Sequence, residues 1–120
     1  MTKEEHYQRL KAFSVRIMKM VDSMPNRISS VAIAKQIVRS GTSPAANYRA
    51  ACIGKSDKDF LNKLKMVEEE LDETLHWLDI IIETDLLPTN RLELIRNECE
   101  ELLRITTSSI ITMRKKLSVE

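Results

Sequence analysis

The chain has 120 residues and a formal net charge of +1, with 42% hydrophobic, 31% charged and 4% aromatic residues. These values fit a single domain over residues 1–120, and the small numbers of Gly, Pro and aromatic residues favour a few long helices over a β-domain. Because no window reaches the roughly 18 to 20 apolar residues that span a bilayer, and the N-terminus lacks the apolar stretch of a signal peptide, we expect a cytoplasmic protein without membrane association.

The first predicted helix starts at a capping motif and stops before a proline. Thr2 and Glu5 have the spacing of a capping box, in which a hydroxyl and a carboxylate bind free N–H groups of the first turn. Pro25 ends the helix, because the residue before a proline is disfavoured in α geometry. Between these points apolar residues recur at helical spacing: Tyr7, Leu10, Phe13, Ile17, Met20, Val21 and Met24.

The second predicted helix begins near Ser29 or Ser30. Its expected inward stripe alternates steps of three and four and consists largely of small residues: Val31, Ala34, Val38, Gly41, Ala45, Tyr48 and Cys52. Small residues let helix backbones approach closely, so we expect this helix to lie tightly against a neighbour. Pro44 costs about 3 kcal/mol in an undistorted helix interior, so a kink or local break is expected at residues 42–44.

Two further helices follow, each after its own capping signal. Ser56 with Asp59 caps the third, whose apolar face consists of Phe60, Leu64, Val67, Leu71, Leu75, Leu78, Ile81 and Ile82. Pro88 breaks the chain, and Asn90 with Glu93 caps the fourth, which carries Leu92, Ile95, Cys99, Leu102, Leu103, Ile110, Met113 and Leu117. Short connections make neighbouring helices antiparallel, so the sequence predicts an all-α, up-down-up-down four-helix bundle.

The charges are divided unevenly along the chain. Residues 1–65 hold eight Lys and five Arg against five acidic residues, a net charge of +8, whereas residues 66–120 carry a net charge of −7. Such asymmetry indicates either mutual neutralisation of basic and acidic helices or a basic surface for an anionic partner. Among the basic residues of the second predicted helix, Tyr48 is the only aromatic residue that could stack on bases. We therefore expect such binding to be weakly selective for nucleotide sequence. The candidate nucleic-acid contacts are Lys35, Arg49, Lys55 and Lys58.

Two acidic motifs were weighed as metal sites. Glu73 and His76 form a Glu-x-x-His, but di-iron bundles need this motif on two helices, and His6 has no glutamate three residues before it. Residues 69–73 spell Glu-Glu-x-x-Glu, which resembles half of the magnesium motif of all-α nucleoside triphosphate pyrophosphohydrolases. The Glu-x-x-Asp that these enzymes carry on the following helix is missing. We therefore predict no metal and no cofactor, and keep this hydrolase as an alternative.

Nucleophilic catalysis has weaker signals still. Cys52 and Cys99 both fall on predicted apolar stripes, where a free thiol is usually a small core residue. With only Gly41 and Gly54 in the chain, no glycine-rich phosphate loop exists. We predict no catalytic residue and no enzymatic activity.

A longer motif carries a family resemblance. Residues 36–51 read Gln-Ile-Val-Arg-Ser-Gly-Thr-Ser-Pro-Ala-Ala-Asn-Tyr-Arg-Ala-Ala, and Ser56, Lys63 and Trp77 stand at matching positions beyond them. The chain resembles the bacterial four helix bundle protein family, also called 23S rRNA intervening-sequence proteins. This resemblance implies an up-down bundle that assembles as a ring-shaped homopentamer, with no established catalytic residues. Some members are encoded within insertions in 23S rRNA genes, and a related branch assists reverse transcriptases.

The polar residues of that motif also have a structural interpretation. Buried polar groups must be paired, so we expect a polar layer that fixes helix register, in which Arg39 and Asn47 on the second helix meet Glu70 and Glu73 on the third. The leading hypothesis is a non-enzymatic homo-oligomer, a pentamer by resemblance, that serves as an accessory or scaffold protein with RNA or DNA as partner. A purely protein–protein scaffold and the magnesium-dependent hydrolase are the alternatives.

Overall fold

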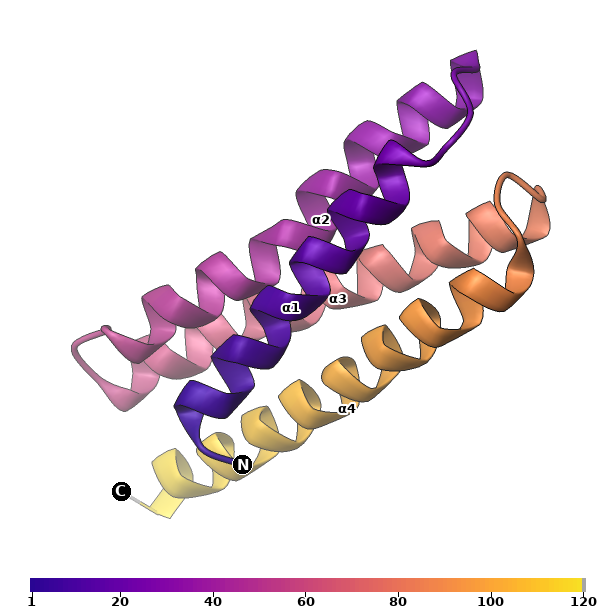
Figure 1. Ribbon diagram of the computed structural model, residues 1–120. Coiled ribbons are helices and arrows are strands. Elements are labelled where there is room, and N and C mark those ends of the chain that lie inside the picture. The colour runs from indigo at the N-terminus through magenta and orange to yellow at the C-terminus, as the bar shows by residue number, and fades with distance from the viewer. Residues whose placement is uncertain (120) are drawn as a thin grey trace.

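The computed structural model describes residues 1–119 and the side chains of residues 1–118. This part of the chain forms four helices and no strand: α1 (Lys3–Asp22), α2 (Ile28–Cys52), α3 (Asp57–Glu83) and α4 (Thr89–Val119). Successive helices run in opposite directions along one elongated bundle with extents of 52 × 21 × 20 Å (Figure 1). The predicted all-α, up-down-up-down architecture is confirmed.

Two of the predicted caps are present, and one is wrong. The side-chain oxygens of Thr2 and Ser56 accept hydrogen bonds from backbone N–H groups three residues later, at 3.1 Å each, so α1 and α3 start as expected. In contrast, α4 already begins at Thr89, and Asn90 lies inside its first turn, where its side-chain oxygen accepts from the next N–H at 3.0 Å. A proline is tolerated at the start of a helix, so Pro88 can directly precede α4. The helix therefore begins at Thr89, before the predicted cap Asn90.

The expected break in α2 is absent, because the helix runs continuously from Ile28 to Cys52 with Pro44 inside it. The hydroxyls of Thr42 and Ser43 donate to the carbonyls four residues earlier, at 2.7 and 2.6 Å, in the turn that leads to the proline. Pro44 itself is buried. Packing of this buried turn therefore outweighs the helix cost of the proline.

The inward face of α2 includes Gly41, Ala45 and Tyr48 of the predicted stripe but differs from it elsewhere. Ser30, Ile37, Ser40 and Ala51 are buried, whereas Val31 is 40% exposed and Cys52 is exposed. Of the two buried serines, Ser40 has a hydrogen-bond partner, whereas the Ser30 hydroxyl has none among the described residues. The Ser40 and Thr74 hydroxyls are hydrogen-bonded to each other at 2.9 Å between α2 and α3. The spacing of apolar and small residues alone predicts Val31 and Cys52 on the inward face, because it does not register buried hydroxyls.

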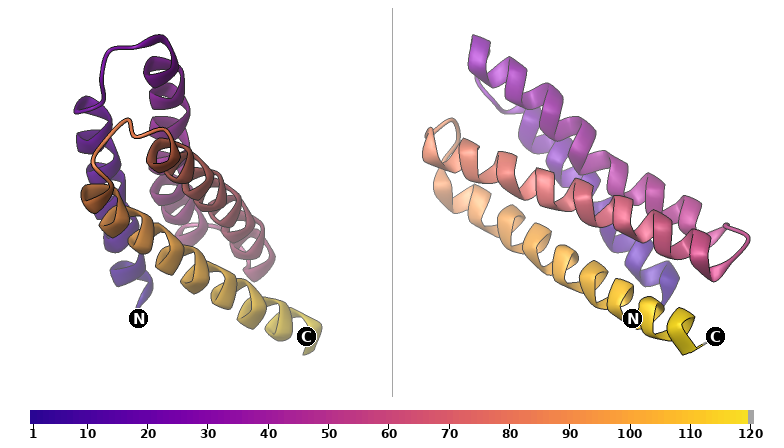
Figure 2. Two further views of the ribbon diagram at one scale, coloured as in Figure 1. Left: turned by 90° about the vertical axis from the view of Figure 1, so that its right-hand side faces the viewer. Right: turned by 180° about the vertical axis from the view of Figure 1, so that it is seen from behind.

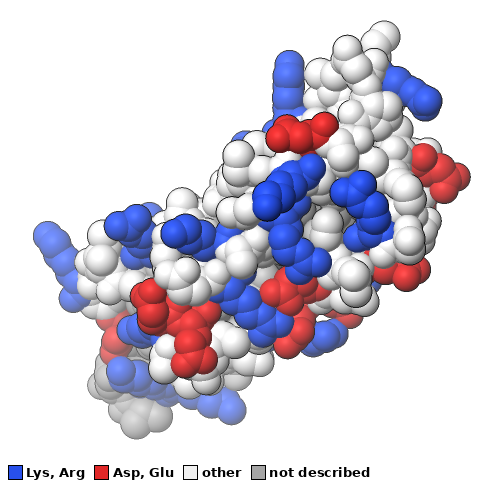
Figure 3. Space-filling model, in the orientation of Figure 1, with Lys and Arg blue, Asp and Glu red and all other residues white. Residues whose placement is uncertain are grey.

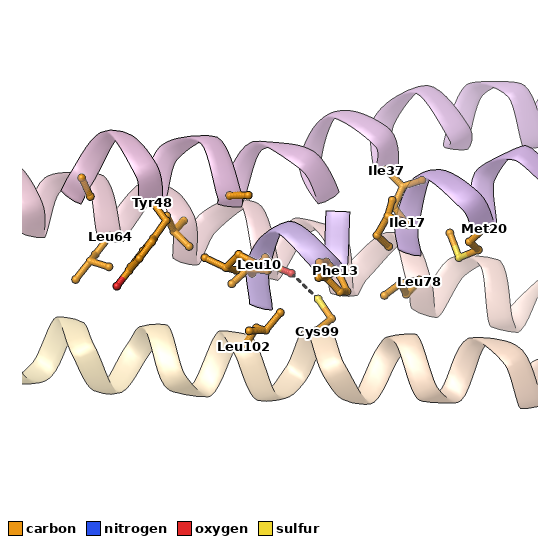
Figure 4. Packing of buried hydrophobic residues seen from close by; sticks show 14 of the residues in the cluster. Leu10, Phe13, Ile17, Met20, Ile37, Tyr48, Leu64, Leu78, Cys99 and Leu102 are labelled. Atoms are coloured by element: carbon orange, nitrogen blue, oxygen red, sulfur yellow. Dashed lines mark hydrogen bonds between the residues drawn. The ribbon is translucent and has the colours of Figure 1, made fainter. Parts of the chain in front are cut away.

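The predicted core is otherwise found on α1, α3 and α4. Fully buried aliphatic and aromatic side chains from these helices and α2 meet along the bundle axis (Figure 4): they include Leu10, Phe13, Ile17, Ile37, Leu64, Leu78 and Leu102. Of the cysteines, Cys99 lies in this core as expected. The core therefore holds all four helices in register.

The predicted close approach of α2 involves α1. At Gly41 a Cβ atom would lie 2.9 Å from Ile17 Cγ2 and 3.2 Å from Ile17 Cβ, closer than side-chain atoms normally pack. The Ser14 hydroxyl lies 3.1 Å from the Gly41 carbonyl oxygen and 3.1 Å from that of Leu10. The contact with Ile17 requires a residue without a side chain at position 41.

The fourth side of the bundle is open at one end. Figure 2 (left) shows α4 running away from α1 toward the two chain ends, where the N-terminal turn of α1 stands apart from the last turns of α4. Among the described residues, no helix combines the length and the apolar character needed to cross a membrane.

Candidate nucleic-acid interface

The four predicted basic contacts all lie at the surface. Lys35 and Arg49 are on α2, Lys55 is in the connection that follows, and Lys58 is in the first turn of α3, and all four are exposed. None of them forms an ion pair with another residue of the described chain, so their charges are available to an external anion. They do not converge on one cleft.

Arg49 belongs to a groove that sequence reasoning missed. The groove has a volume of about 450 Å³ and lies between the first three turns of α1 and the C-terminal end of α2. Lys3, Tyr7 and Lys11 line it from α1, opposite Arg49 and Cys52 of α2. The i, i+4 spacing of the three α1 residues places them on one helix face. That spacing was a usable signal, but Tyr7 was assigned to the core.

The two tyrosines differ in burial. Tyr48 is only 3% exposed and packs in the core (Figure 4), which confirms its predicted place on the inward stripe of α2 and leaves it unable to stack on bases. Burial raises the pKa of Tyr48 to about 12, and interaction with the Cys52 thiol adds to the shift. Tyr7 is half-buried and forms part of the groove. The groove thus combines three cations and one accessible aromatic ring with one carboxylate, that of Glu4.

Neutralisation between the two halves of the chain is limited. In the described residues, Arg9 and Arg39 are the only cations of residues 1–65 that pair with carboxylates of the acidic half. Arg9 binds Glu98 and Glu101, at 2.8 Å each. On the face seen in Figure 3, basic side chains are interspersed with acidic ones.

Arg39 lies at the centre of a polar cluster between α2 and α3. Its Nη1 donates to Glu70 Oε2 at 3.0 Å, and its Nη2 donates to Glu73, which also accepts from Trp77 Nε1 at 3.0 Å. The expected partner Asn47 forms no hydrogen bond to either carboxylate; it is half-buried on α2. The guanidinium therefore links two turns of α3 to α2 without the amide.

The residues considered for metal binding and for nucleophilic catalysis lie at separate positions in the bundle. His76 is exposed beside Trp77, and no group of three His, Cys, Asp or Glu side chains in the described chain is arranged to hold a metal ion. Cys52 is exposed, contrary to the prediction that it is a core residue. The Cys99 thiol donates to the Leu71 carbonyl at 3.3 Å, and burial raises the pKa of this thiol to about 12, which disfavours the thiolate.

Comparisons with known proteins agree on one family. A family model described as 23S rRNA-intervening sequence protein matches residues 2–108. A crystal structure of a protein with unknown function from the S23 ribosomal protein family of Bacteroides thetaiotaomicron VPI-5482 is 34% identical, with a TM-score of 0.82. The match covers 88% of this chain and 97% of that chain, and neither description names an enzymatic activity. No curated protein matches this sequence.

Proposed function

The chain belongs to the 23S rRNA-intervening sequence protein family, and we propose that it is a non-catalytic, homo-oligomeric accessory protein that binds single-stranded RNA or DNA. The observation that supports this function is the basic groove between α1 and α2. Lysine and arginine side chains bind phosphates, and an exposed aromatic ring offers a stacking surface for a base. Lys3, Tyr7, Lys11 and Arg49 supply both kinds of group in one place.

Binding of this kind depends on the backbone more than on sequence. Lys11 and Arg49 contact successive phosphates while one base stacks on Tyr7, and the groove offers few polar groups that read base edges. Lys35 on α2 and Lys58 on α3 are exposed and add further cations outside the groove. We therefore expect salt-sensitive, weakly sequence-selective affinity.

Self-association is the second part of the proposal. Apolar side chains remain exposed on α1 and α4, notably Val15 at 44%, Met18 at 51% and Leu94 at 67%, and a homopentamer would cover such groups. A ring also repeats the groove in each copy, which raises the avidity for a long strand. Light scattering measures the mass directly; a monomer at micromolar concentration contradicts this part of the proposal.

The alternative function, a magnesium-dependent hydrolase, would need carboxylates that already form ion pairs. A magnesium site on residues 69–73 requires free carboxylates, whereas Arg39 binds those of Glu70 and Glu73. An assay of pyrophosphate release from nucleoside triphosphates with Mg²⁺ tests this directly. Product formation that is lost on Glu70→Gln substitution would establish the hydrolase instead.

Fluorescence anisotropy with labelled single strands of about 20 nucleotides tests nucleic-acid binding over a salt series. We expect Lys11→Glu and Arg49→Glu each to weaken binding and to reduce the salt slope by about 0.7 per lost phosphate contact. Lys19→Glu is the matched control, because Lys19 is an exposed α1 lysine outside the groove. Absence of affinity at about 50 mM salt would contradict the proposal and favour a purely protein–protein scaffold.

A further inference from the structure

A second cavity, separate from the basic groove, opens where α4 diverges from α1. Its volume is about 650 Å³, and all four helices contribute to its lining. Small-molecule sites commonly have volumes of about 300 to 1,000 Å³, with apolar walls and a few polar groups. The walls include the apolar or aromatic side chains of Tyr48, Phe60, Ile105 and Met113.

One polar group in this wall has no partner. His6 is 4% exposed, and its Nε2 is buried without a hydrogen bond to any described residue. Its ring lies 4.2 Å from that of Tyr48, measured between centroids. Burial lowers the pKa of His6, and the charge of Arg9 lowers it further, so the imidazole is neutral at pH 7. An unpaired buried polar atom destabilises the folded chain, and a ligand with a matching group would recover that loss.

Among the side chains that line this cavity, one cation has no carboxylate partner in the described chain. Glu101 lines the cavity but binds Arg9 at 2.8 Å, and Arg104 lines it but binds Glu100 at 2.9 Å. Lys3 has no carboxylate partner in the described chain; its Nζ lies 4.5 Å from the centroid of the Phe60 ring. The mouth of the cavity therefore favours an anionic group near Lys3.

Hydroxyl groups complete the lining. Ser108, Ser109 and Thr112 are contributed by α4, on the side toward which the hydroxyl end of Tyr48 points (Figure 4). A purely aliphatic acid would leave the His6 nitrogen unpaired and would not use the Ser108 and Thr112 hydroxyls; the Ser109 hydroxyl already donates to the Ile105 carbonyl at 3.1 Å. A ligand with a flat ring, a polar ring edge, several hydroxyls and one anionic group matches every part of the wall.

We propose that this cavity binds a nucleoside monophosphate. The base lies against Tyr48 and Met113 with its polar edge at His6 Nε2, the sugar meets the α4 hydroxyls, and the phosphate pairs with Lys3. A nucleobase carries both donors and acceptors, so it matches a neutral imidazole in either tautomer. This site does not depend on strand binding in the α1–α2 groove, although Lys3 borders both.

Isothermal titration calorimetry of the full chain with AMP, GMP, CMP and UMP tests the site. We expect saturable binding of at least one nucleotide per chain, about tenfold weaker in His6→Phe and several-fold weaker in Lys3→Met. Lys19→Met is the control and should bind like the parent protein, because Lys19 is exposed and does not line the cavity. Lys11→Glu, which should weaken strand binding, is expected to leave mononucleotide affinity unchanged.

Amide chemical shifts of the parent protein locate the ligand without any substitution. Nucleotide-induced changes at Ser108, Ser109 and Thr112 support the proposal. Changes confined to the α1–α2 groove, binding of decanoate but of no nucleotide, or no heat signal with about 5 mM nucleotide would overturn it. So would equal nucleotide affinity in the parent protein and a folded His6→Phe variant.

Discussion

The contact between Gly41 and Ile17 gives a sharp test of how α1 packs on α2. In Gly41→Ala, the new methyl group would lie 2.9 Å from Ile17 Cγ2, 3.0 Å from Cγ1 and 3.2 Å from Cβ. These atoms are close to the Ile17 backbone, and Ile17 is fully buried. The side chain therefore cannot turn aside, and the helices must separate to relieve the contact.

Two opposing effects set the expected change in the free energy of unfolding. Alanine stabilises a helix interior by about 1 kcal/mol relative to glycine. Overpacking of a full core costs about 1 to 3 kcal/mol. We expect Gly41→Ala to destabilise the protein by about 1 kcal/mol, and Gly41→Val by about 2 to 3 kcal/mol, because valine adds more volume and gains less helix propensity.

Urea unfolding at one fixed protein concentration measures these changes. The sign should reverse in an Ile17→Ala background, where Gly41→Ala stabilises by about 1 kcal/mol because the clashing Cγ atoms are gone. Ile17→Val is the matched control, since valine keeps both Cγ atoms and should keep the loss. Ala46→Gly, on the exposed side of α2, calibrates the propensity term. Stabilisation by Gly41→Ala in the parent protein would refute the packing argument.

Three further predictions concern the polar and thiol groups. Arg39→Met should lower the free energy of unfolding by up to about 1 kcal/mol at low salt and by less at high salt, because the ion pairs of Arg39 are partly exposed; urea unfolding at two salt concentrations checks this. Because the pKa of His6 is lowered in the folded chain, the unfolded chain binds more protons than the folded chain below the ordinary pKa of 6.5. The free energy of unfolding should therefore fall as the pH decreases through that value. Urea midpoints measured from pH 5 to 8 should show a weaker decrease in His6→Phe than in the parent protein. Ellman's reagent should modify exposed Cys52 rapidly and buried Cys99 only on unfolding; rapid reaction of both thiols would contradict the buried core position.

Long-range architecture was predictable because the strongest signals were periodic and local. The Thr2 and Ser56 caps and the apolar faces of α1 and α3 follow from spacing alone. The α2 face was predictable only in part: Gly41, Ala45 and Tyr48 are buried as expected, but apolar periodicity cannot register a buried hydroxyl. Ser40 is buried through its contact with Thr74, 34 residues away in the sequence.

The site residues divide by the same logic. The pairing of Arg39 with α3 carboxylates could be anticipated from complementary charges on neighbouring helices. The groove residues Lys3 and Lys11 could not be joined to Arg49 from spacing alone, because their proximity depends on which face of α1 meets the end of α2. His6 was overlooked as a cavity residue because divergence of α4 from α1 is a tertiary property.

Ion pairs within the acidic half of the chain explain why the uneven charge of the sequence persists on the surface. Carboxylates of α3 and α4 are partly neutralised by arginines of their own half, as Arg96 pairs with Asp79 at 2.6 Å and with Glu100 at 2.7 Å. Because these acidic groups have local partners, most cations of α1 and α2 are not drawn into the bundle. The sequence asymmetry is thereby preserved as a surface asymmetry, which is the condition that electrostatic attraction of a polyanion requires.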